Sequence, residues 1–154
     1  MNVLIVGGSG YIGSVLMELL GQNHFVWNYD ALHGERVNDV SLLKKFCAQK
    51  DVVIYLASLS NNDLCEKNPI YAKSVNQDCF PDVMATAKEA GIKHFIYASS
   101  VAAYGSGEDL TEDDPLNPTT IYGEGKKFCE EYLETSGVPY TIVRAATVCG
   151  WSPK

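Results

Sequence analysis

The chain has 154 residues, a length typical of one domain, and we predict a single domain over residues 1–154. Hydrophobic residues make up 46% and charged residues 20%, which supports a folded core and excludes intrinsic disorder. The formal net charge of -7 argues against nucleic acid and anionic membranes as partners, because both attract Lys and Arg. One phosphorylated ligand held by backbone amides is compatible with this charge.

The cysteines, the histidines and the N-terminal segment bear on location and metal content. The five cysteines include no Cys-x-x-Cys pair, so we expect reduced thiols in a cytosolic protein. The three histidines are scattered along the chain, and we expect no metal site. No segment is apolar over enough residues to span a bilayer, and an N-terminal strand leaves no room for a signal peptide. These features predict a cytoplasmic location.

Short apolar runs alternate with stretches of helical spacing along the whole chain. The first run, Asn2–Val6, ends in glycines and predicts a buried parallel strand, and residues 11–20 then place their apolar side chains on one side of a helix. In chain order we expect a strand at 2–6, a helix at 11–20, a strand at 25–29, a residual strand at 37–40, a helix from 41, a strand at 52–56, a helix at 69–90, a strand at 94–98, a helix at 121–135 and a strand at 140–144. Such alternation predicts an α/β fold, in which a parallel sheet has helices on both faces.

The long helix expected at 69–90 contains Pro81. A proline inside a helix removes one hydrogen bond and clashes with the preceding turn, at a cost of roughly 3 kcal/mol or more. We therefore predict a kink or a break near Phe80.

The glycine-rich segment Gly7–Gly13 lies between the first expected strand and the first expected helix. At this place Gly7 permits a tight turn, Gly10 lets a pyrophosphate approach the backbone, and Gly13 lets the helix pack closely on the strand. The helix N-terminus adds free amides and the positive end of the dipole. The motif predicts a dinucleotide site, and the alternative is a turn that is glycine-rich by chance.

Asp30 closes the second expected strand, 17 residues after Gly13. A carboxylate there can accept both ribose hydroxyls of NAD and repels the additional phosphate of NADP. NAD is therefore the predicted cofactor. The alternative is an acid exposed to solvent, and the nearby Arg36 complicates the choice between the two cofactors.

Tyr122 and Lys126 are four residues apart and share one face of the last expected helix. A tyrosine with an ordinary pKa of about 10 is a poor base, and a neighbouring ammonium is expected to lower that pKa. Ser100 follows the strand at 94–98, where a hydroxyl can bond the oxygen that is oxidised or reduced. Each signal is weak alone, since Tyr-x-x-x-Lys occurs by chance and a serine often caps a strand end. Together with the glycine loop they indicate a catalytic site.

These blocks, in this order, resemble the extended short-chain dehydrogenase/reductases, and in particular the NAD-dependent epimerase/dehydratase family with its UDP-galactose 4-epimerase-like members. The resemblance covers nearly the whole chain and implies a Rossmann-type, doubly wound parallel sheet. The motifs that carry it are Gly7-Gly-Ser-Gly-Tyr-Ile-Gly13, Asp30, Asp39-Val40, Leu56-Ala57-Ser58, Asn76, Ser99-Ser100-Val-Ala-Ala-Tyr-Gly105, Tyr122-x-x-x-Lys126, and Arg144 with Gly150.

The resemblance also implies a role for each motif. Ser100, Tyr122 and Lys126 would be catalytic, with Tyr122 as the acid/base and Lys126 as its partner, and Lys126 would also reach the nicotinamide ribose. The cofactor-binding residues would be Gly7, Gly10, Tyr11, Ile12 and Gly13 at the pyrophosphate, Asp30 at the adenosine ribose, Asp39 and Val40 around the adenine, Leu56, Ala57 and Ser58 along the cleft, and Asn76, Tyr122 and Lys126 near the reacting end.

The chain departs from the family pattern at a few positions. Val6 replaces a usual threonine, and Ala145 replaces a common proline. Lys154 ends the chain where relatives continue for roughly as many residues again, so we expect it to lack the domain that binds the nucleotide-sugar. Ala102 occupies the position where dehydratases and decarboxylases usually carry an acid, which favours an epimerase or a simple dehydrogenase/reductase.

Two functions follow as hypotheses. The chain is part of an NAD-dependent nucleotide-sugar epimerase, inactive without its C-terminal half, or it is a non-catalytic NAD-binding module that acts as a sensor or a partner subunit. Relatives often pair through the helices that contain Tyr122 and that precede Ser99, and a homodimer is therefore a further expectation. The apolar residues on the first of these helices serve equally well as core: Ile121, Phe128, Cys129, Tyr132 and Leu133.

Overall fold

A five-stranded parallel sheet forms the centre of the computed structural model, which describes residues 1–150. The strand order is β2-β1-β3-β4-β5, so the chain starts near the middle of the sheet and builds outward to both edges. The strands are β1 (Asn2–Val6), β2 (Phe25–Tyr29), β3 (Val52–Tyr55), β4 (His94–Ser100) and β5 (Tyr140–Ala145). This doubly wound, all-parallel order is Rossmann-like and confirms the predicted fold class.

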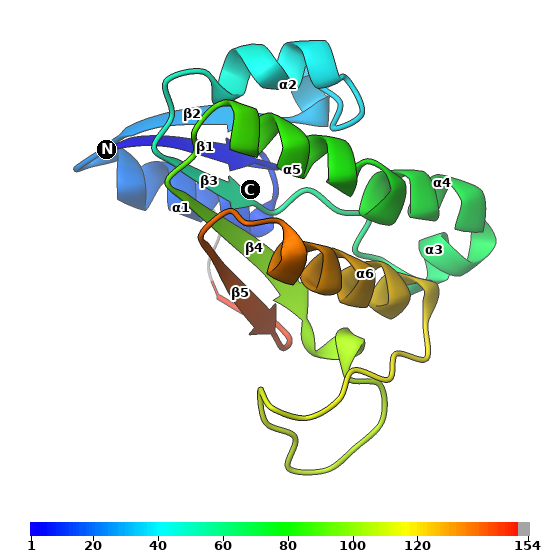
Figure 1. Ribbon diagram of the computed structural model, residues 1–154. Helices are drawn as coiled ribbons and strands as arrows, with labels where there is room; N and C mark the ends of the chain where they lie inside the picture. Colours follow the sequence, from blue (N-terminus) through cyan, green and yellow to red (C-terminus); the bar gives the residue numbers. More distant parts are fainter. Residues whose placement is uncertain (151–154) are drawn as a thin grey trace.

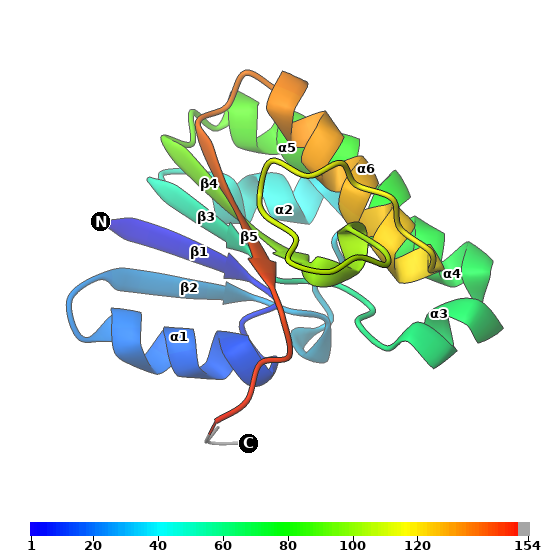
Figure 2. The same ribbon diagram turned by 90° about the horizontal axis from the view of Figure 1, so that it is seen from below.

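Helices pack against both faces of the sheet (Figure 1). Viewed from below, α1 lies on one side of the sheet, and α2, α5 and α6 lie on the other (Figure 2). The helices are α1 (Tyr11–Gly21), α2 (Val40–Cys47), α3 (Asn62–Lys67), α4 (Pro69–Lys73), α5 (Phe80–Glu89) and α6 (Ile121–Thr135). Within the described residues, no helix is long and apolar enough to cross a bilayer.

The core is divided between the two faces. The larger cluster includes Phe80, Phe95, Tyr97 and Leu133, all at most 2% exposed, and lies between the sheet and the α2, α5 and α6 side. The smaller cluster forms under α1, around Ile5 and its neighbours on β1 and β3. Burial of these apolar side chains, at about 25 cal/mol per Å² of apolar surface, fixes the faces of the strands and helices.

The expected helix at 69–90 is interrupted, as Pro81 predicts. α4 ends at Lys73, a π-helical turn follows at Ser74–Asp78, and α5 starts at Phe80 with the proline in its first turn. A proline is tolerated there because the first amides of a helix have no intrahelical acceptor.

Two local expectations need correction. Residues 37–40 do not form a residual strand: residues 37–38 form a turn, and Asp39 caps α2, which begins at Val40, by accepting from the Leu42 amide at 3.0 Å. The helix α3 was not expected, although Asn61 is a typical cap and accepts from the Leu64 amide at 2.9 Å.

The apolar residues on α6 belong mainly to the core. Cys129 and Leu133 are buried, and Phe128 and Tyr132 pack partly buried against the same cluster. This surface therefore gives no support to the homodimer, which stays a prediction.

Candidate active site

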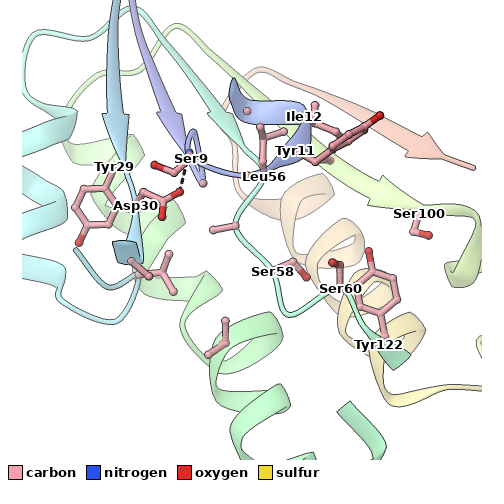
Figure 3. Close-up of a pocket in the computed structure, with 18 of the residues that line it drawn as sticks. Ser9, Tyr11, Ile12, Tyr29, Asp30, Leu56, Ser58, Ser60, Ser100 and Tyr122 are labelled. Carbon is pink, nitrogen blue, oxygen red and sulfur yellow. Dashed lines mark hydrogen bonds between the residues drawn. The ribbon is translucent and has the colours of Figure 1, made fainter. Parts of the chain in front are cut away.

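A cleft of about 830 Å³ lies at the carboxyl ends of the strands. It is bounded by the glycine loop after β1, the end of β2, the segment after β3, the end of β4 and the first turns of α6 (Figure 3). Ligands of open parallel sheets bind at this edge. Of the predicted site residues the cleft brings together Gly7, Gly10, Tyr11, Ile12, Gly13, Asp30, Leu56, Ala57, Ser58, Ser100, Tyr122 and Lys126.

The glycines of the loop have different steric reasons to lack a side chain. Gly7 has φ +90°, and a Cβ there would lie 2.8 Å from the Ala57 amide nitrogen. A Cβ on Gly13 would lie 2.6 Å from the Gly8 Cα, so the packing of α1 on the loop excludes it. A Cβ on Gly10 would meet only the Gly7 carbonyl oxygen, at 3.3 Å. The surrounding protein atoms therefore leave almost enough room for a side chain at Gly10, and this free space fits a ligand phosphate.

The N-terminus of α1 opens into this space. Gly10 is the capping residue, and among residues 1–150 no side chain caps this helix end. These amides lack intrahelical acceptors and lie at the positive end of the helix dipole, an arrangement that suits an anion. The 11-residue helix and its open cap therefore fit the pyrophosphate of a dinucleotide.

Asp30 is held at the end of β2 by two backbone amides. Its carboxylate accepts from the Ser9 amide of the glycine loop at 2.8 Å (Figure 3) and from the Leu32 amide at 2.9 Å. The Ser9 hydroxyl in turn accepts from the Asn28 side chain at 2.8 Å, which ties the loop to β2. The carboxylate is therefore fixed beside the loop, where it can accept the hydroxyls of a ribose.

Lys126 is buried beneath the cleft, with 3% of its surface exposed. Its Nζ donates to the Ala98 carbonyl oxygen at 2.7 Å and lies 4.9 Å and 5.4 Å from the ring centres of Tyr97 and Tyr122. Burial penalises the ammonium and lowers the pKa of Lys126 to about 8.

The pKa of Tyr122 moves in the direction opposite to the one expected from the sequence. Burial raises it above its ordinary value, while a hydrogen bond with Ser100 acts in the lowering direction and offsets only part of the rise. The prediction of a lowered pKa was wrong for the unliganded chain, because the helical spacing to Lys126 says nothing about how deeply the phenol is buried.

Ser100 and Ser99 end β4 with their side chains in different surroundings. Ser100 lines the cleft with Tyr122 (Figure 3), and its hydroxyl accepts from the Ala102 amide at 3.2 Å. The Ser99 hydroxyl donates to the buried carboxylate of Glu130 on α6. Glu130 also binds Arg144 of β5 through two bonds of 2.9 and 2.8 Å, so one carboxylate joins α6 to the ends of two neighbouring strands.

Three predicted cofactor residues do not line the cleft. Asp39 and Val40 belong to a separate shallow depression at the start of α2. Asn76 is buried behind the cleft, where its side chain accepts from the Leu59 amide at 2.7 Å and from the Ser58 hydroxyl at 3.1 Å. Asn76 therefore holds the segment after β3 in place and does not itself line the cleft.

Several residues of the cleft were not predicted. Most belong to segments without a motif, such as Glu35 in the connection after β2 and Tyr71 on α4. Ser9 could have been found from its place inside the glycine loop. Glu130 carries a weak sequence signal, because it lies one helical spacing beyond Lys126 on the same face of α6.

Comparisons with known proteins agree with this geometry. The sequence model of the NAD dependent epimerase/dehydratase family matches residues 3–154. The UDP-glucose 4-epimerase of Lactobacillus helveticus is 31% identical, over 99% of this chain and 53% of that protein. The N-acetyl-alpha-D-glucosaminyl-diphospho-ditrans,octacis-undecaprenol 4-epimerase of Escherichia coli O157:H7 is 30% identical, over 86% and 42%. The chain thus spans about half the length of the curated relatives it matches.

Solved structures show the same similarity. The UDP-N-acetylglucosamine 4-epimerase of Methanobrevibacter ruminantium M1 aligns with a TM-score of 0.84 and 28% identity, over 93% of this chain and 54% of that one. The UDP-glucose 4-epimerase of Brucella ovis, solved in complex with NAD, aligns with a TM-score of 0.82 and 26% identity, over 93% and 51%. These matches confirm the predicted family, whose description names NAD dependence. The chain belongs to the NAD dependent epimerase/dehydratase family.

Proposed function

We propose that this chain binds NAD in the cleft and supplies the cofactor half of a nucleotide-sugar 4-epimerase. One observation carries the proposal: a single cleft joins an open helix N-terminus, the fixed carboxylate of Asp30 and the trio Ser100, Tyr122 and Lys126. The epimerases named above make a nucleotide-linked sugar the favoured substrate class, and the C-terminal half of such an enzyme would bind it.

Each of the polar residues in the cleft would have a separate role in such a reaction. When bound, NAD supplies a hydride acceptor at its nicotinamide ring. Tyr122 removes the proton of the sugar hydroxyl, Ser100 hydrogen-bonds the same oxygen, and Lys126 places a positive charge near the phenol. Because Tyr122 would return the same proton to the sugar oxygen, the reaction would need no further acid, which is consistent with Ala102 at its position after Ser100.

The raised pKa of Tyr122 favours a second candidate, an NAD-binding module without turnover. In the chain as it stands the phenol keeps its proton at neutral pH, and proton abstraction requires that a ligand or a further domain change its surroundings. The two candidates differ in one testable property: only an enzyme would convert a nucleotide-sugar when joined to a C-terminal half.

The test joins residues 1–150 to the C-terminal half of the Lactobacillus helveticus relative. The expected result is interconversion of UDP-glucose and its 4-epimer with NAD retained between turnovers, and loss of turnover but not of NAD binding in the Tyr122→Phe variant. NAD binding without conversion by the folded chimera would support the module instead. Release of water or carbon dioxide from the nucleotide-sugar would overturn the assignment to epimerases.

A further inference from the structure

Glu35 is a second carboxylate at the ribose end of the cleft. Its side chain is only 16% exposed, and Oε2 accepts from the Asp30 amide at 2.7 Å. The Glu35 amide donates to the Asp30 carbonyl oxygen at 3.3 Å, so Glu35 binds both backbone groups of Asp30. The connection after β2 thus folds back to hold the residue predicted to select the cofactor.

The two carboxylates differ in how their charge is compensated. Both oxygens of Asp30 accept backbone amides, from Ser9 and Leu32. In the described part of the chain Glu35 accepts hydrogen bonds through Oε2 alone, and within 4 Å its carboxylate meets no Lys or Arg side chain, only Nδ1 of the His33 ring at 3.9 Å. The charge of Glu35 therefore adds to that of Asp30 at this end of the cleft.

A cation also lines this end of the cleft. Arg36 is exposed, and its guanidinium forms no ion pair among residues 1–150. Its backbone oxygen accepts from the Tyr29 hydroxyl at 2.7 Å, and the residue lines the cleft. A guanidinium is a good partner for a phosphate, so Arg36 alone would favour a phosphorylated ribose.

We propose that Glu35 is a second determinant of the selectivity for NAD over NADP, acting together with Asp30. This inference rests on the proposed binding of NAD in the cleft. Glu35 has two separable effects: its hydrogen bonds position Asp30, and its charge opposes the attraction that Arg36 exerts on the 2′-phosphate of NADP. Removal of the Asp30 charge alone therefore leaves a preference for NAD.

The experiment titrates NAD and NADP into the full chain by calorimetry, for the wild type and four variants. Glu35→Gln keeps an acceptor for the Asp30 amide and removes the charge, so NADP is expected to bind about three- to tenfold more tightly, with NAD changed less than about twofold. Glu35→Ala also removes the acceptor, and NAD binding is expected to weaken. The control Glu134→Gln makes the same charge change on the exposed end of α6, outside the cleft, and leaves the selectivity unchanged.

An unchanged ratio of the two affinities in folded Glu35→Gln would overturn the role of Glu35. Asp30→Asn provides an independent arm, in which NAD is expected to bind at least about threefold better than NADP because Glu35 is intact. Equal affinities in that variant would also overturn it. Absence of binding of either cofactor to the wild type would instead refute the proposed function, which distinguishes the two failures.

Discussion

Gly10 and Gly13 lie in the same loop, but the structure predicts opposite consequences when they are replaced. The backbone of Gly10, with φ -74° and ψ 179°, is extended and suits a β-branched residue. A Cβ there would meet only the Gly7 carbonyl oxygen, at 3.3 Å. The Gly10→Val variant should therefore fold, with a free energy of unfolding within about 1 kcal/mol of the wild type.

Gly13 leaves no such freedom. A Cβ would lie 2.6 Å from the Gly8 Cα and 2.7 Å from the Gly8 carbonyl carbon, and backbone atoms cannot rotate away as a side chain does. Overpacking of this kind typically costs about 1–3 kcal/mol. The Gly13→Ala variant should therefore lose stability even though the added group is a single methyl.

For NAD affinity, in contrast to stability, we expect a large effect at Gly10. The valine side chain of the Gly10→Val variant would fill the space in front of the α1 N-terminus, where the pyrophosphate is expected, and should weaken NAD at least about 100-fold, or about 2.7 kcal/mol. Urea unfolding followed by circular dichroism measures stability, and calorimetric titration measures binding. Gly21→Val is the matched control, because a Cβ there meets nothing within 4 Å and lies at the other end of α1. Undiminished NAD affinity in folded Gly10→Val would refute the assignment of this loop.

Three further predictions concern charged groups. Burial lowers the pKa of Lys126 from 10.5 to about 8, which corresponds to a free-energy cost of about 3 kcal/mol for burying the charged ammonium. The Lys126→Met variant avoids this cost and should be more stable than the wild type at pH 7. That difference should shrink as pH rises from about 8 toward 10.5, where the folded state has already lost the proton that the unfolded state still binds, and urea midpoints at pH 7 and 9.5 test this. Glu130→Ala leaves Arg144 and Ser99 without their buried partner and should cost about 3–5 kcal/mol in urea unfolding, whereas a loss below about 1 kcal/mol would contradict the joining role. The wild type should bind NAD at least about tenfold more tightly than NADP because of Asp30, and equal affinities in calorimetric titration would reject this.

The features that the sequence predicted well are those set by local pattern. The strand Phe25–Tyr29 and the helix Ile121–Thr135 have the bounds that their apolar spacing indicates. The glycine loop and Asp30 meet in one cleft because parallel strands bring their carboxyl ends to the same edge of the sheet. Pro81 marked the helix break because its effect on the backbone is local.

The remaining features depend on contacts between distant segments. Burial sets the pKa values of Tyr122 and Lys126, and burial follows from the packing of α6 on the sheet rather than from the spacing of the two residues. Glu130 gains its role from Ser99 and Arg144, which are cross-strand neighbours only in the folded sheet. Glu35 reaches Asp30 only because the connection after β2 folds back, and no periodicity indicates that turn.

Amide chemical shifts measured during an NAD titration test the central claim most directly, because they locate the ligand without requiring turnover. The account predicts that the largest shifts fall on the glycine loop Gly7–Gly13, on Asp30 and on the Ser100 and Tyr122 end of the same cleft. Saturation at one equivalent would agree with a single site. No shifts at millimolar NAD, or shifts confined to the depression around Asp39 at the start of α2, would contradict it.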